Sequence, residues 1–251
     1  HKLLNYNKTR KLSEFNNEWC NSILSSGYYL GNKFDLDDNE LDYIISEIDK
    51  YSSEGNQKET KKFFRVIDLK NETISFIIKC LTKRDPEFID FTNSYCAGDA
   101  FIHSAQYVRS NFESEDLKSS QLYHRDYAST ATFKIFIYLS DVLHEDEGPF
   151  SFLKHHKESL FKKIRYYSFH KPLTWENSLP RGIKKEVLGQ KGKVFFVDTY
   201  NLYHCGSRVK EHGPERKVII LTFRFKKLMS GIEEWENWIP MPLNNFENAS
   251  K

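Results

Sequence analysis

The chain has 251 residues, of which 39% are hydrophobic, and its 37 Lys and Arg nearly balance its 35 Asp and Glu. This balance argues against a dedicated nucleic-acid-binding protein, in which we expect a strongly basic domain. The four cysteines form no CxxC pair, so we expect reduced thiols and a cytoplasmic location. No apolar run reaches the roughly 18 residues that indicate a transmembrane helix, so we expect no membrane span.

The first hundred residues have the period of amphipathic helices. Apolar residues at four-residue spacing predict a helix over about 11–25, which Gly27 ends. Two further stretches repeat the i, i+3, i+4, i+7 pattern and predict helices over 38–52 and 72–83. We therefore expect residues 1–100 to form mainly a helical support.

After residue 100 the period of the apolar residues changes to two, which is typical of strands. The stretches with this pattern are AFIHSAQYV, SSQLYHRDY, TFKIFIYLSDV, GPFSFLK, KKEVLGQ, GKVFFVDT, NLYHCGS and RKVIILTFRF. Short strands at this spacing indicate a sandwich or barrel, and helices before strands indicate an α+β fold. We predict one domain over 1–251, with a β-barrel core over 101–225 and a C-terminal extension over 226–251.

One stretch, 154–186, breaks the rhythm of the strands. It carries nine Lys or Arg against three Glu, together with Pro172 and Pro180. We interpret it as an insertion or lid between two strands. Residues 31–60 have the opposite bias, with nine acids against three lysines. Two interpretations are open: both stretches are solvated surface, or the basic one covers an anionic substrate.

The motif LYHRD places His124 and Asp126 two residues apart beside a predicted strand. Alternate side chains of a strand share a face, so we expect His124 and Asp126 to point one way and Arg125 the other. His204 follows in the segment GKVFFVDTYNLYHCGS and offers a third ligand. Two imidazoles and one carboxylate form the facial triad that suits non-haem Fe(II), with positions left open for a co-substrate and O₂.

Arg216 begins the last predicted strand, twelve residues after His204, and is a candidate anion anchor. Its planar guanidinium can make two parallel charge-assisted hydrogen bonds to a carboxylate. Its strand face is otherwise apolar at Val218 and Ile220, where a cation is costly unless it has a partner. Arg224 shares this face and is a second candidate, or else a structural ion-pair partner.

These motifs together resemble the phytanoyl-CoA dioxygenase-like (PhyH) branch of the Fe(II)/2-oxoglutarate oxygenases. The matching segments are YHRD, FKIFIYLSDV, EDEGPFSFLKHHKES, GKVFFVDTYNLYHCGS and RKVIILTFRF, and the pattern covers residues 121–225. The resemblance implies a double-stranded β-helix, which is a jelly-roll, cupin-like barrel with supporting helices. It also implies that His124, Asp126 and His204 hold iron and that Arg216 binds the distal carboxylate of 2-oxoglutarate.

Three further residues are candidates for contact with 2-oxoglutarate. Gln106 and Tyr107 lie on the strand before the HxD motif, and Ser207 follows the distal histidine closely. The alternative for each is a polar side chain that is satisfied within its own strand. Lys134 is interpreted as a surface lysine, with a further anion partner as the alternative.

The implied activity is hydroxylation of an unactivated C–H bond of a small molecule, with conversion of 2-oxoglutarate and O₂ to succinate and CO₂. Because Asp126 is present, hydroxylation is favoured over halogenation, in which a small residue replaces the carboxylate. Desaturation or cyclisation by the same oxidative chemistry is an alternative. Two others are a zinc hydrolase with the same His₂Asp set, although no HExxH occurs, and a non-catalytic barrel that serves as a binding module.

Overall fold

Helices come first along the chain and most strands follow, as the change of period predicts. The computed structural model describes residues 11–53, 58–61, 64–96, 100–112, 119–126, 133–157, 181–225 and 241–242. Its early helical elements are the 3₁₀ turn η1 (Leu12–Glu14) and the helices α1 (Glu18–Ser26), α2 (Asp38–Ser53), α3 (Asn71–Arg84) and α4 (Phe88–Tyr95). None of the helices described is long and apolar enough to cross a membrane.

The predicted helices agree with the structure except at the N-terminal end. Those over 38–52 and 72–83 are confirmed as α2 and α3. The helix predicted over 11–25 is divided, because the backbone is extended at Asn17 between η1 and α1. Gly27 ends α1 with a φ of 80°, a left-handed conformation that glycine adopts without strain. Helix α4 was not predicted, since eight residues hold few turns in which a period can stand out.

The strands form two antiparallel sheets. The larger has the order β1 (Tyr28–Tyr29), β8 (Val194–Val197), β5 (Phe133–Tyr138), β10 (Arg216–Phe225), β4 (Ala100–Ser110), β3 (Phe64–Asp68) and β2 (Lys58–Lys61), and β11 (Met241–Pro242) also pairs with β4. The smaller has the order β7 (Arg181–Val187), β6 (Phe150–Lys157) and β9 (His204–Gly206).

One predicted strand is wrong, and two strands were missed. Over 119–127, Ser119–Gln121 form a 3₁₀ turn, η2, and only His124 pairs, in an isolated bridge. Leu122 and Tyr123 are the only large apolar residues before the histidine, which is too few to specify a strand face. Strands β2 and β3 lie in the part of the chain expected to be helical.

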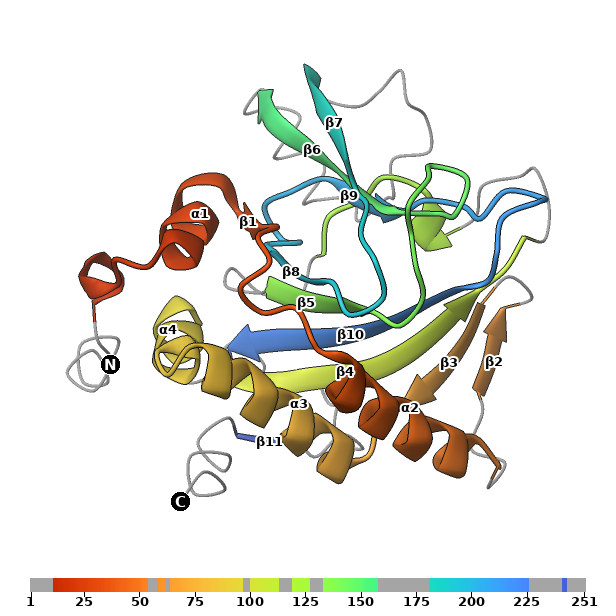
Figure 1. The fold of residues 1–251 in the computed structure, drawn as a ribbon. Coiled ribbons are helices and arrows are strands. Elements are labelled where there is room, and N and C mark those ends of the chain that lie inside the picture. The colour runs from red at the N-terminus through yellow and green to blue at the C-terminus, as the bar shows by residue number, and fades with distance from the viewer. Residues whose placement is uncertain are drawn as a thin grey trace, which may run out of the picture.

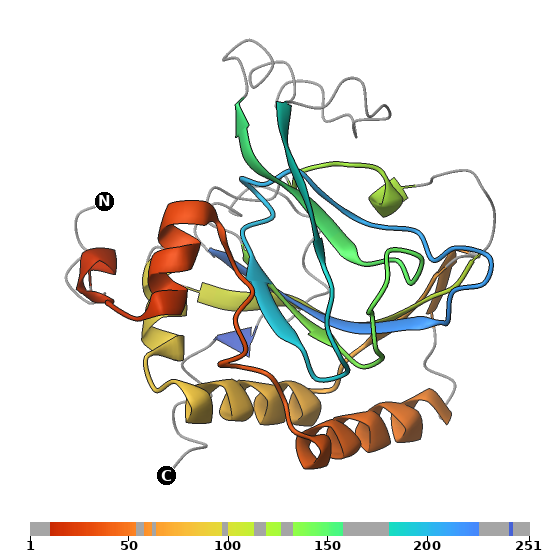
Figure 2. The ribbon, with the colours of Figure 1, turned by 45° about the horizontal axis from the view of Figure 1, so that its top comes forward.

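The two faces of the larger sheet are covered differently, which confirms the predicted α+β, double-stranded β-helix fold. Figures 1 and 2 show α2 and α3 on one side of this sheet and the smaller sheet on the other. A large apolar cluster fills the space between helices and sheet, with Trp19, Ile77 and Phe223 among its members. A second cluster, which includes Phe136 and Phe150, lies between the two sheets.

Strand pairing at the centre of the larger sheet determines which residues face the space between the sheets. On β10, Ile219, Leu221 and Phe223 belong to the helix-side cluster, so their neighbours in sequence point to the other side. The pairing of β10 with β4 shifts between Thr222 and Phe223, which leaves His103 as the extra residue of a β-bulge. A bulge re-aims side chains and is common beside functional sites.

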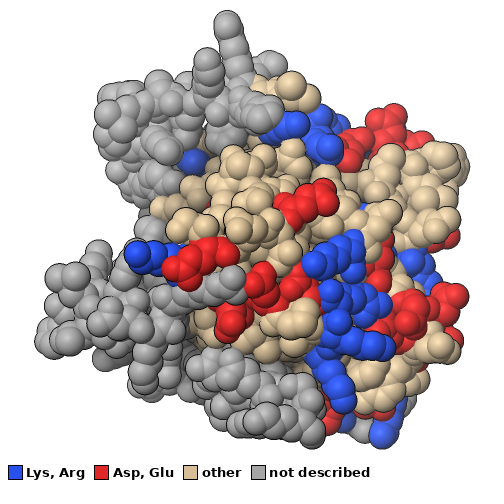
Figure 3. Space-filling model, turned by 60° about the vertical axis from the view of Figure 1, so that its left-hand side comes forward, with Lys and Arg blue, Asp and Glu red and all other residues tan. Residues whose placement is uncertain are grey.

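The exterior carries both signs of charge side by side. Figure 3 shows acidic and basic side chains interspersed on the face that carries the N-terminal elements, as the balanced composition predicts. All four cysteines are free and buried. Most of the predicted insertion 154–186 and of the C-terminal extension 226–251 lies outside the described residues; the two ends of the insertion pair with each other as parts of β6 and β7.

Candidate metal centre

A backbone bridge brings together the two histidines that the sequence singles out. The His124 N–H donates to the His204 carbonyl at 2.9 Å, and the His204 N–H donates to the His124 carbonyl at 2.8 Å. The backbone N–H of Asp126 donates to the Thr199 carbonyl at 2.9 Å, which anchors the HxD segment to the loop after β8. The three candidate ligands are thus positioned by backbone hydrogen bonds.

The same carbonyl contact orients each imidazole. Nδ1 of His124 lies 2.8 Å from the Leu122 carbonyl, and Nδ1 of His204 lies 3.0 Å from the Leu202 carbonyl. A carbonyl can only accept, so each Nδ1 carries the hydrogen and each Nε2 keeps its lone pair. This is the arrangement by which proteins present imidazole to a metal.

Asp126 completes the set. One ligand atom from each of His124, Asp126 and His204 lies within 4.8 Å of the other two, and Asp126 Oδ2 is 3.8 Å from His204 Nε2. Burial opposes ionisation of Asp126, but Lys134 and His204 outweigh it and hold the pKa of this carboxyl below its usual range. Burial also lowers the pKa of His124, and lowers that of His204 to about 3. Two neutral imidazoles and one carboxylate match the donor set of non-haem Fe(II), so these residues fit such an ion.

Arg125 points away from this centre, as the alternation predicts, and packs behind it. Its guanidinium lies 4.4 Å from the centre of the Tyr203 ring and donates to the Tyr203 hydroxyl at 3.2 Å. Arg125 is only 2% exposed and is a neighbour in sequence of both His124 and Asp126, while Tyr203 precedes His204. The pair therefore links the two ligand-bearing segments a second time, by side chains.

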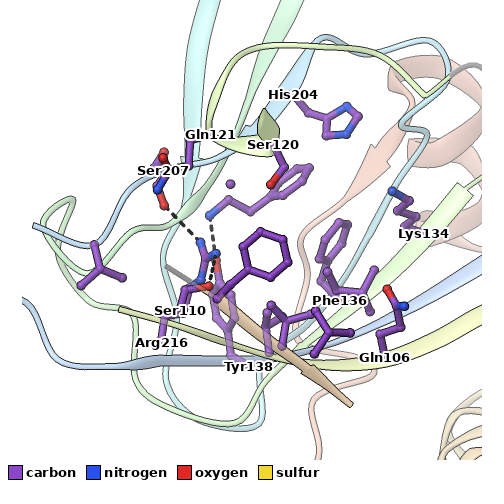
Figure 4. A pocket seen from close by; sticks show the side chains of 18 of the residues that line it. Gln106, Ser110, Ser120, Gln121, Lys134, Phe136, Tyr138, His204, Ser207 and Arg216 are labelled. Carbon is purple, nitrogen blue, oxygen red and sulfur yellow. Dashed lines mark hydrogen bonds between the residues drawn. The ribbon is translucent and has the colours of Figure 1, made fainter. Parts of the chain in front are cut away.

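A cavity of about 240 Å³ lies beside the candidate ligands, between the two sheets. Its walls come from β3, β4, β5, β6, β9 and β10, and Figure 4 shows their side chains converging on it. Most of the wall is apolar, with Phe136, Phe150, Val218 and Ile220 among the lining residues. A largely apolar pocket with a few placed polar groups is the usual form of a small-molecule site.

Arg216 lies at one end of the cavity and is held by neutral acceptors. Its guanidinium donates to the Ser110 hydroxyl at 3.1 Å, to the Ser207 carbonyl at 3.4 Å and to the Gly148 carbonyl (Figure 4). A Cβ on Gly206 would lie 3.3 Å from Arg216 Nη2, so the glycine leaves the guanidinium room. Burial lowers the pKa of Arg216. Among the residues that the structure describes, none supplies Arg216 with a carboxylate.

The other candidates for contact with a co-substrate are placed unequally. Gln106 and Ser207 line the cavity. Gln106 Nε2 donates to Asp68 Oδ1 at 3.0 Å, and the hydroxyls of Ser207 and Ser151 lie 2.7 Å apart. Tyr107 points to the opposite face of β4 and packs in the helix-side cluster, so we leave it out of the candidate site.

Two cations on the inner strands lie near Asp126. Lys134 lines the cavity, and its Nζ is 2.7 Å from Asp126 Oδ2, so the interpretation as a surface lysine is wrong. Its alternation with Phe136 and Tyr138 on one strand face was the signal for its placement. Arg224 is not among the residues that line the cavity, and burial lowers its pKa to about 10 although Asp126 opposes this.

Neither models of protein families nor curated proteins match this chain. Solved structures do match it in fold. HygX from Streptomyces hygroscopicus with nickel, 2-oxoglutarate and hygromycin B has a TM-score of 0.57 at 11% identity, covering 94% of this chain and 100% of that one. The epimerase SnoN in complex with Fe³⁺, alpha-ketoglutarate and nogalamycin RO has a TM-score of 0.56 at 12% identity, covering 82% and 81%.

A third match is EctD from S. alaskensis with 2-oxoglutarate and 5-hydroxyectoine. It has a TM-score of 0.52 at 9% identity, covering 82% of this chain and 74% of that one. At such low identities the likeness is one of fold. The chain therefore has the fold of proteins whose solved structures hold 2-oxoglutarate.

Proposed function

We propose that this protein is an Fe(II)- and 2-oxoglutarate-dependent oxygenase of the phytanoyl-CoA dioxygenase-like type, which hydroxylates a small molecule. The observation that carries the proposal is the convergence of His124, Asp126 and His204 beside a cavity that also holds Arg216. A metal triad alone fits several chemistries, but an arginine held only by neutral acceptors adds the requirement for an anion. The fold shared with proteins that bind 2-oxoglutarate supports the same conclusion.

Nε2 of His124, Nε2 of His204 and the carboxylate of Asp126 would hold the iron. When bound, Fe(II) supplies the activation of O₂ and the oxidation of a C–H bond. The overall reaction consumes a C–H substrate, O₂ and 2-oxoglutarate, and yields the alcohol, succinate and CO₂. One oxygen atom enters the alcohol and the other enters succinate.

The chain itself binds, orients and excludes water. Arg216 pairs with the distal carboxylate of 2-oxoglutarate, and Ser110 and Ser207 hold its guanidinium in place. Phe136 and Val218 form apolar walls between Arg216 and the metal ligands, where the carbon chain of the co-substrate would lie. A bound reactant held in a fixed position beside the metal reacts with a smaller entropic cost.

Two alternatives make different demands on the cavity. A zinc hydrolase commonly needs a general base near the metal, but no Asp or Glu is among the described lining residues. Oxidative chemistry with an outcome other than hydroxylation uses the same site, and SnoN shows that an epimerase has this fold. The mass of the product distinguishes hydroxylation, which adds one oxygen, from desaturation, cyclisation and epimerisation, which add none.

The test is formation of succinate from 2-oxoglutarate by the purified protein with Fe(II) and O₂. We expect succinate to depend on both iron and O₂, and Asp126→Ala to reduce it to the level seen without iron. Asp42→Ala, at an exposed position on α2, is the matched control and should change nothing. Full activity of Asp126→Ala, or turnover without O₂, would contradict the proposal.

A further inference from the structure

The neighbourhood of the cavity has two cationic ends, and the proposed function uses only one of them. Arg216 is at one end, and Lys134 lies across Phe136 from it (Figure 4). Arg224 is eight residues beyond Arg216 on β10, roughly 26 Å along an extended strand. Even with both side chains reaching inward, a five-carbon dicarboxylate bound to Arg216 cannot also reach Arg224. The second end is therefore available to another molecule.

Charge accounting at the metal centre leaves Lys134 in excess. A divalent ion and Arg216 together carry three positive charges, and Asp126 and 2-oxoglutarate together carry three negative ones. Lys134 adds a further positive charge, and its ion-pair partner among the described residues is Asp126, whose charge the metal would share. The Lys134 side chain is only 20% exposed. An excess charge in such a partly buried place is costly unless an anion accompanies it.

Two neighbours on adjacent strands extend this end of the site. The β-bulge in β4 makes His103 the extra residue opposite Thr222, and Thr222 pairs with Lys134 on its other side. Burial, Arg224 and Lys134 together lower the pKa of His103 to about 4, so all three side chains are close enough to interact. His103 is consequently neutral at physiological pH and adds a hydrogen-bonding group rather than a third charge.

We propose that Lys134, together with Arg224, binds a carboxylate or phosphate group of the molecule that is oxidised. This inference rests on the proposed function and narrows its substrate to small organic acids or phosphate esters. The nine Lys or Arg against three Glu in 154–186 point to an anionic substrate from a different part of the sequence. Lys134 supplies a compact point charge beside the metal, and Arg224 supplies a fork suited to two oxygens.

The test measures anion binding to the protein loaded with Fe(II) and 2-oxoglutarate under anaerobic conditions. The probes are inorganic phosphate and butyrate, with neutral butyramide as the matched control, and the readouts are thermal stability and the visible absorption of the loaded protein. We expect saturable binding of at least one anion and none of butyramide. Lys134→Gln and Arg224→Gln should each weaken the anion at least tenfold, the loss expected for one charged hydrogen bond. Lys134→Arg should retain binding, and Lys191→Gln, in a loop, should have no effect.

Each outcome separates a distinct explanation. If Lys134→Gln weakens iron or 2-oxoglutarate but leaves the anion unchanged, Lys134 only orients Asp126 and the inference fails. If the anion binds equally well to Arg224→Gln and Lys134→Gln, it binds the metal directly, and the inference also fails. No saturable anion binding by the wild-type protein overturns it as well. Anion binding needs no turnover, so a protein that binds the anion but makes no succinate would contradict the proposed function instead.

Discussion

The helix-covered face and the cavity face of the larger sheet are built from the same strands but differ in chemistry. On β10, Leu221 and Phe223 are fully buried against helices, while Arg216 and Thr222 point to the other side. The helix side consists of apolar and aromatic contacts, whereas the cavity side combines apolar walls with cations and hydroxyls. The comparison teaches that a residue's position in the alternation, odd or even, decides whether a substitution should affect stability or binding.

The largest effect should come from the helix side. Phe223 is 0% exposed and stacks on Phe133 with ring centres 5.1 Å apart. Phe223→Ala should lower the free energy of unfolding by about 3–5 kcal/mol, measured by urea denaturation, because it leaves a cavity in the core. Metal affinity of the folded variant should be unchanged. A loss of metal binding by a variant that is still folded would show that the two faces are not independent.

On the cavity side, Arg216→Met should act on binding. We expect the affinity for 2-oxoglutarate to fall about 100-fold, within the 2–5 kcal/mol typical of a buried charged contact, by anaerobic calorimetry. Thermal stability should be equal or higher, since an apolar side chain replaces a half-buried cation. Arg224→Met is the matched variant. Should it alone weaken 2-oxoglutarate, Arg224 would be the anchor.

A smaller effect sharpens the comparison behind the metal ligands. Arg125→Met should weaken metal affinity by about 10–100-fold, the usual effect of removing a group that supports metal ligands. The reason is its contact with Tyr203, which ties the HxD segment to the segment of His204. Tyr203→Phe keeps the ring and should cost less. Titration of the metal-free protein with Co(II) gives both values, and equal affinities throughout would remove the Arg125–Tyr203 pair from this role.

The smallest effect concerns acid. His103 has its pKa lowered from 6.5 to about 4 by burial, Arg224 and Lys134. Above pH 6.5 it is neutral whether folded or unfolded; below 6.5 the unfolded chain takes up a proton that the folded chain resists, so stability falls as the pH falls towards 4. His103→Gln should reduce this loss by roughly 1 kcal/mol, or about 2–4 °C in Tm. Identical acid profiles for the variant and wild type would contradict this.

Much of this arrangement could be predicted because local patterns specify it. The alternation around His124 and Asp126, and the spacing to His204, suffice to bring these residues together in the folded chain. The helices over 38–52 and 72–83 follow from periods that extend over several turns. Such signals are contained within one segment, so tertiary structure has little opportunity to override them.

What could not be predicted depends on strand register and on short segments. Ser110 contacts Arg216 because β4 and β10 pair in a register that places the two residues opposite each other. No local pattern reveals that register, nor the bulge that re-aims His103. The turn at 119–121 has too few apolar residues to distinguish it from a strand. Lys134 was misjudged because a lysine beside apolar neighbours has the same local pattern whether it faces solvent or a buried carboxylate.

The reciprocal backbone hydrogen bonds between His124 and His204 have a consequence for how this site can change over time. Because each ligand-bearing segment is paired with the other, a displacement of one carries the other with it. The spacing of the two imidazoles is thereby separated from the conformation of the loops that flank them. Lineages of this fold can remodel those loops for new molecules while they retain the same metal chemistry.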